Sequence, residues 1–173
     1  MKIDGGFTVI EAMTAVFILA VGMLAAAGMQ IRAIGATSNG MTRTLANAMA
    51  LSIMEELKRI PFDDPRLIDR NGKGTAGLND GAGIRGETVM PERADHQFSP
   101  DNFPNFINTY KVMNGDITDG SGRAYQIFWN IDKSPLDAGH PPAFCRISLF
   151  VYWRTPMGQQ HLQLTGLRHN NSE

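Results

Sequence analysis

The longest apolar stretch of the chain is residues 7–31, FTVIEAMTAVFILAVGMLAAAGMQI, where Glu11 is the only charge among 25 residues. About 20 consecutive apolar residues suffice for a helix to cross the hydrocarbon core of a bilayer. The stretch contains no proline, and glycines such as Gly22 and Gly28 are tolerated in membrane helices. The pattern therefore predicts a transmembrane helix over residues 7–31.

An amphipathic pattern follows over residues 32–60. Strong helix formers fill residues 41–60, and apolar side chains recur there at helical spacing. This stripe consists of Leu45, Met49, Ile53, Leu57 and Ile60. Pro61 cannot continue the hydrogen-bond ladder of a helix, so we expect the helix to end just before it. The stripe needs an apolar cover from elsewhere in the chain.

Three segments near the carboxyl terminus, residues 123–133, 143–155 and 159–167, alternate apolar and polar side chains with the period of a β-strand. The side chains predicted to face inward are Tyr125, Ile127, Trp129, Ile131, Cys145, Ile147, Leu149, Val151, Trp153, Leu162 and Leu164. Residues 156–158 (PMG) predict a tight hairpin between the last two strands.

The predicted helix and sheet each need a cover, and each can bury the apolar face of the other. We therefore predict an α+β fold, in which a long amino-terminal transmembrane and amphipathic helix packs on a small antiparallel β-sheet formed by residues 123–173. Residues 61–122 are polar and rich in glycine and proline. For them we expect a loop-rich, variable region with one strand near residues 106–112, and we expect partner specificity to lie in these loops.

Composition and residue spacing argue against charge-driven binding of nucleic acid or lipid, against a disulfide and against a histidine metal site. The chain has 173 residues and a net charge of −1, so no global field draws it to nucleic acid or anionic lipid. Cys145 is the only cysteine, which excludes an intrachain disulfide, and we predict a buried structural thiol. The four histidines are scattered without the spacing of a metal site, at positions 96, 140, 161 and 169.

Two loop motifs match known sites only in part. Residues 72–77 (GKGTAG) fit the letters GxGxxG, but neither a preceding apolar strand nor a following helix pattern supports a nucleotide site. Residues 69–72 (DRNG) are similar to the start of a calcium loop, but Lys73 occupies a position that needs an oxygen ligand. Asp116, Asp119 and Ser121 form an oxygen-rich turn whose calcium binding stays open. No catalytic serine, histidine and aspartate motif is present, so we expect no enzymatic activity, no cofactor, no metal and no small-molecule substrate.

The residues around Glu11 leave three interpretations open. Residues 25–27 (AAA) could be the cleavage site of a secretory signal peptide, although the leader MKIDGG balances its lysine with an aspartate. A plain single-pass anchor would place Glu11 among lipid headgroups, but it leaves the two glycines and the phenylalanine before it unexplained. Cleavage between Gly6 and Phe7 would instead free an amine about one helical turn from Glu11. That amine could pair with the carboxylate within one chain or between packed helices, which removes much of the cost of a buried charge.

Residues 6–11 (GFTVIE) resemble the class III signal of type IV prepilins and of type II secretion pseudopilins. In that family a prepilin peptidase cuts after the glycine and methylates the new terminal residue, and a glutamate is the fifth residue of the mature chain. The resemblance implies cleavage after Gly6, N-methylation of Phe7 and an assembly role for Glu11. Residues 18–24 (ILAVGML) and 28–30 (GMQ) are similar to PilV-type minor pilins, although many major pilins carry proline where Gly28 stands.

On this resemblance we expect a minor type IV pilin with a leader at residues 1–6, a membrane and filament-core helix at 7–31 and its amphipathic continuation at 32–60. The implied partners are prepilin peptidase, other major and minor pilins and the inner-membrane pilus assembly platform. The implied location is the bacterial inner membrane, with the domain outside the cytoplasm, and then the pilus filament. The subunit would prime or decorate the pilus and contribute to adhesion, motility or DNA uptake.

Two alternatives remain open on the sequence. One is a pseudopilin of a type II secretion system, which shares the amino-terminal pattern. The other is a membrane-tethered binding domain that does not polymerise.

Overall fold

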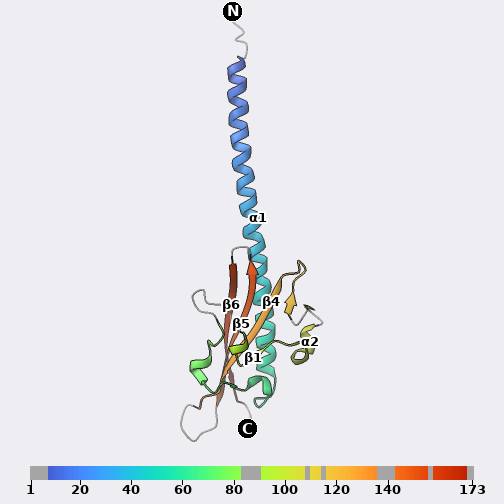
Figure 1. Cartoon of the computed structure of the whole chain (residues 1–173), viewed down its shortest axis with the longest axis vertical. Helices are drawn as coiled ribbons and strands as arrows, with labels where there is room; N and C mark the ends of the chain where they lie inside the picture. Colours follow the sequence, from blue (N-terminus) through green and yellow to red (C-terminus); the bar gives the residue numbers. More distant parts are fainter. Residues whose placement is uncertain are drawn as a thin grey trace, which may run out of the picture. The chain divides into compact units, whose positions relative to one another are not determined.

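A computed structural model describes residues 8–82, 91–107, 110–113, 116–135, 143–155 and 158–170. The chain divides into two compact units, residues 1–43 and residues 44–173. Helix α1 (Val9–Arg59) contributes its first part to one unit and its last part to the other (Figure 1). The fold therefore contains one long amino-terminal helix and an antiparallel sheet, as the α+β prediction requires.

The bounds of α1 follow from local chemistry at each end. Gly28, Asn39 and Gly40 are all helical, so no glycine ends the hydrogen-bond ladder early. Lys58 and Arg59 lie in the last turn, where cations interact favourably with the carboxyl end of a helix. Pro61 follows directly, and the helix ends before it as predicted.

The second unit is built on one antiparallel sheet with the strand order β2-β3-β4-β5-β6. Its strands are β2 (Lys111–Met113), β3 (Asp116–Thr118), β4 (Ala124–Asp132), β5 (Phe144–Thr155) and β6 (Gly158–His169). The short strand β1 (His96–Gln97) also pairs with β4, with His96 opposite Trp129. The three long strands confirm the period-2 predictions, and the pairing of Thr155 with Gly158 places β5 and β6 side by side.

The main core lies between the sheet and residues 44–59 of α1, which run along the sheet in Figure 1. Met49, Ile53 and Leu57 of the predicted stripe are completely buried. They meet the predicted inward face of β4 and β5, which is Tyr125, Ile127, Trp129, Ile131, Cys145, Ile147, Leu149, Val151 and Trp153. Trp129 also donates a hydrogen bond of 2.9 Å from Nε1 to the carbonyl oxygen of Arg66, so its polar atom is satisfied inside the core.

The opposite face of the sheet is covered as well, which the strand alternation does not predict. Phe128, Phe150 and Tyr152 form a second cluster with Ala82. The polar neighbour Asn130 is buried, and its Nδ2 donates to the carbonyl oxygens of Leu78 and Asp80 at 3.2 and 2.9 Å. The polar segment before Ala82 therefore lies on this face and is held there by hydrogen bonds.

The expected strand at residues 106–112 is displaced in the structure. Residues 106 and 107 belong instead to the short helix α2 (Pro104–Ile107), which begins at a proline, a residue favoured at the first helical position. Phe106 is buried against Phe98, with ring centroids 5.3 Å apart. The strand that does form is β2, and strands β1, β2 and β3 all come from the region expected to be loop-rich.

Short 3₁₀ helices make up further parts of that region. They are η1 (Pro65–Leu67), η2 (Gly74–Gly77), η4 (Pro91–Arg93) and η5 (Pro100–Asn102). Three of the four begin at a proline, whose fixed φ suits the first turn of a helix.

Replacing Trp129 with alanine tests the main core. We expect the free energy of unfolding to fall by about 3–5 kcal/mol, because a fully buried indole is removed and a cavity is left behind. Urea titration of the detergent-solubilised chain, followed by circular dichroism, measures this change. Leu167→Ala is the control, since Leu167 is 49% exposed and its loss should change stability by less than about 1 kcal/mol. Equal effects of the two substitutions would show that the helix and the sheet do not share the core described.

Candidate functional site

The first part of α1 carries an exposed apolar surface. Within the described residues of its own unit, no other segment covers this surface. No residue of its apolar stretch is buried. Phe17 and Leu24, for example, are 70% and 74% exposed. The helix is long and apolar enough to cross a membrane, a finding that rests on length and composition and that a signal sequence would also satisfy.

The hydroxyl of Thr14 in this segment has its hydrogen-bond partner within the helix itself. The Thr14 hydroxyl donates to the carbonyl oxygen of Ile10 at 2.8 Å. Such internal satisfaction suits a segment that enters hydrocarbon, where water cannot complete a hydrogen bond.

Glu11 lies in the first turn of α1 and closes a capping box with Thr8. Its Oε2 accepts from the Thr8 backbone N–H at 2.9 Å and from the Thr8 hydroxyl at 2.8 Å. In return the Glu11 backbone N–H donates to Thr8 Oγ1 at 3.4 Å. The Thr8 carbonyl accepts the first helical bond from Ala12 at 3.2 Å, which makes Thr8 the N-cap.

This capping box gives Glu11 a local role that our sequence analysis missed. The signal was present, because threonine followed three residues later by glutamate at the start of an apolar run is the capping-box pattern. A carboxylate in the first turn also interacts favourably with the positive end of the helix dipole. Gly6 and Phe7, the predicted cleavage and methylation positions, lie outside the described residues.

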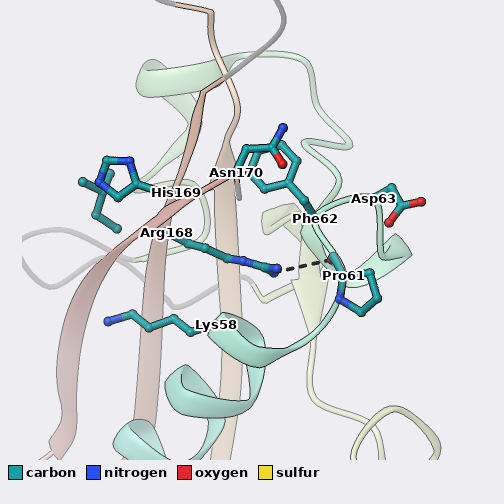
Figure 2. Close-up of a pocket in the computed structure, with 8 residues that line it drawn as sticks. Lys58, Pro61, Phe62, Asp63, Arg168, His169 and Asn170 are labelled. Carbon is teal, nitrogen blue, oxygen red and sulfur yellow. Dashed lines mark hydrogen bonds between the residues drawn. The ribbon is translucent and has the colours of Figure 1, made fainter. Parts of the chain in front are cut away.

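A cavity of about 910 Å³ lies where α1 ends against β6 (Figure 2). Arg168 reaches across it, and its Nη1 donates to the carbonyl oxygens of Leu57 and Pro61 at 3.3 and 3.4 Å. Its guanidinium also lies 5.8 Å from the centre of the Phe62 ring. Arg168 thus satisfies one carbonyl in the last turn of the helix, that of Leu57, and one just beyond the helix end, that of Pro61.

The basic side chains around this cavity do not converge on one point. In Figure 2 Lys58 points away from Arg168, and His169 lies on the same side as Lys58. An anionic ligand would need several of these cations together, so the cavity is best interpreted as part of the packing between the helix end and β6.

Three other residues that the sequence suggested for catalysis or metal binding are buried or hydrogen-bonded within the fold. Cys145 is buried as predicted, and burial raises the pKa of its thiol to about 11, which disfavours the reactive thiolate. Burial lowers the pKa of His96, whose Nε2 lies 2.8 Å from the carbonyl oxygen of Ile68. Asp119 Oδ1 accepts from the backbone N–H groups of Ser121 and Arg123, both at 2.9 Å, as in a closed turn. Among the residues that the structure describes, no group of three or more histidine, cysteine, aspartate or glutamate side chains could hold a metal.

No family model, curated protein or solved structure matches this chain. The features that bear on its function are the apolar helix and the residues at its start.

Proposed function

We propose that this chain is a minor type IV pilin, a structural subunit of a filament and not an enzyme. The observation that carries the proposal is an apolar helical segment with no buried residue, whose first turn holds a single carboxylate, Glu11, four residues after Phe7. In the proposal a prepilin peptidase cuts after Gly6 and methylates the amine of Phe7. The mature subunit is held in the inner membrane, with its domain outside the cytoplasm, until the assembly platform moves it into the pilus.

The charge of Glu11 supports a role in assembly. A carboxylate inside a membrane helix costs roughly 2.5–3.5 kcal/mol at the helix centre on insertion scales, and an apolar residue would avoid this cost. Thr8 offsets part of it in the single chain by donating two hydrogen bonds. A neutral cap would do the same, so the capping box does not require a charge. The terminal amine of a cleaved neighbour would be the matching cation in a core of packed helices.

The helix surface also suits close packing with other helices. Small residues interrupt the large apolar ones at positions such as Ala12, Ala15, Ala20 and Gly22. A Cβ built on Gly22 meets nothing within 4 Å, so another helix could approach the backbone there. In this proposal, helix packing with other major and minor pilins holds the filament together.

Gly6→Val tests the proposed processing. A β-branched residue in place of the glycine should block the peptidase, because the cut would fall directly after a bulky side chain. The uncut leader should then remain on the membrane-extracted protein, where mass spectrometry detects it. Lys2→Ala is the control and should be processed normally. Normal removal of the leader in Gly6→Val would exclude cleavage by a prepilin peptidase.

Three substitutions separate the charge of Glu11 from its capping role. Glu11→Gln keeps a capping box but removes the charge, Glu11→Leu removes both, and Thr8→Ala removes the cap but keeps the charge. We expect both Glu11 variants to be recovered in sheared filaments at least about tenfold less than the native chain, because a neighbour's amine loses its counter-charge in an apolar core. Thr8→Ala should assemble nearly normally.

The amount of each variant in the membrane and the fraction cleaved after Gly6 are measured beside filament recovery. Both should stay close to native, because Glu11→Leu makes membrane insertion easier and leaves the cleavage position unchanged. If Glu11→Gln assembles normally while Thr8→Ala and Glu11→Leu fail, Glu11 acts as a helix cap and the charge has no role in assembly.

A further inference from the structure

The loop from Asp69 to Asp80 is wrapped tightly around its own polar groups. The backbone N–H groups of Gly72 and Gly74 each donate to the Asp69 carboxylate at 2.8 Å, one to Oδ1 and the other to Oδ2. The Lys73 N–H donates to Asn71 Oδ1 at 2.9 Å. Gly74 has a φ of +53°, a conformation that other residues adopt at a cost.

The spacing of these residues is that of a 12-residue calcium loop. Such loops place oxygen ligands at positions 1, 3, 5 and 12 and glycine at position 6, where the chain turns sharply. Counted from Asp69, these positions are Asp69, Asn71, Lys73, Asp80 and Gly74. The chain departs from the pattern at position 5, where a cation replaces an oxygen ligand, and at position 12, where Asp80 stands in place of the usual bidentate glutamate.

The ammonium group of that lysine reaches the far end of the loop. Lys73 Nζ lies 2.5 Å from Asp80 Oδ2, and Asn71 Nδ2 lies 3.4 Å from the same oxygen. A Cβ on Gly77 would lie 2.8 Å from Asn71 Oδ1, so the chain folds closely over this cluster. Positions 3, 5 and 12 of the loop thus meet at one point, and a positive charge from within the chain stands beside the carboxylate.

We propose that Lys73 is a built-in counter-cation that holds this loop closed in the way that a bound calcium ion holds a loop of the same spacing. The ammonium neutralises Asp80 and ties the end of the loop to its middle, so the closed form needs no metal. This inference concerns residues 69–80 alone and does not depend on the filament proposal.

The closed loop has a structural consequence, because it covers the outer face of the sheet. Asn130 donates to the carbonyl oxygens of Leu78 and Asp80, and the Thr75 hydroxyl donates to Asp132 Oδ2 at 2.7 Å. An open loop would leave the buried amide of Asn130 and the buried Asp132 without these partners.

Lys73→Met in the full chain, solubilised in detergent, tests the closing role. Hydrogen exchange at the amides of Gly72 and Gly74 should accelerate by about tenfold, because both amides depend on the closed loop. Arg70→Met removes the same charge from an exposed position in this loop and should leave the exchange unchanged. Unchanged exchange in Lys73→Met would overturn the proposal, as would equal acceleration in both variants.

Lys73→Asp tests whether the ammonium stands in for a metal. This change restores an oxygen ligand at position 5, so about 1 mM calcium should raise the unfolding temperature of the variant relative to excess chelator. The native chain and Lys73→Met should show no calcium response, and adding Asp69→Asn to Lys73→Asp should abolish it. The proposal would be contradicted if calcium raised the unfolding temperature of the native chain as much as that of Lys73→Asp. It would also be contradicted if Lys73→Asp folded but its unfolding temperature did not change with calcium. If Lys73→Asp does not fold, the comparison of Lys73→Met with Arg70→Met decides.

Discussion

A single carboxylate must be accommodated at the start of a helix whose next 20 residues carry no charge. In the isolated chain Thr8 accommodates it through two hydrogen bonds to Glu11 Oε2. That solution is local, and it leaves the exposed apolar surface of the helix without a cover. Lipid can cover that surface, and so can the matching helices of other subunits. The filament proposal follows from requiring one arrangement to satisfy both the charge and the apolar surface.

The second unit also has to cover apolar surface and satisfy polar groups. It does so within the unit itself. The stripe of Met49, Ile53 and Leu57 is completely buried against β4 and β5. From strand β6, Arg168 donates to the carbonyl oxygens of Leu57 in the last turn of the helix and of Pro61 just after it. The same helix α1 therefore has an amino-terminal part that needs a partner from outside its unit and a carboxyl-terminal part that does not.

The sequence predicted the elements whose apolar residues recur with a regular period. The helix stripe and the alternation along β4 and β5 are long, so one misplaced residue does not hide the pattern. The cover on the outer face of the sheet was not predicted. It is made by hydrogen bonds such as those from Asn130 to Leu78 and Asp80, which join residues about 50 positions apart and leave no periodic trace. The strand expected at residues 106–112 was displaced because Pro104 starts a short helix there. At the candidate site an assembly role for Glu11 was predicted from its isolation and its family resemblance and stays a prediction, whereas its bond to Thr8 was overlooked.

The central claim is that Glu11 lies close to a new terminal amine in the mature chain, and mass spectrometry of the native protein tests it most directly. The protein should be extracted from membranes and from sheared filaments, and its amino-terminal peptide should be sequenced. The account predicts a chain that begins at Phe7 with a methylated amine in both fractions. A chain that still begins at Met1, or one that begins after residues 25–27, would contradict the account, because Glu11 would then lack the amine or be lost with a signal peptide.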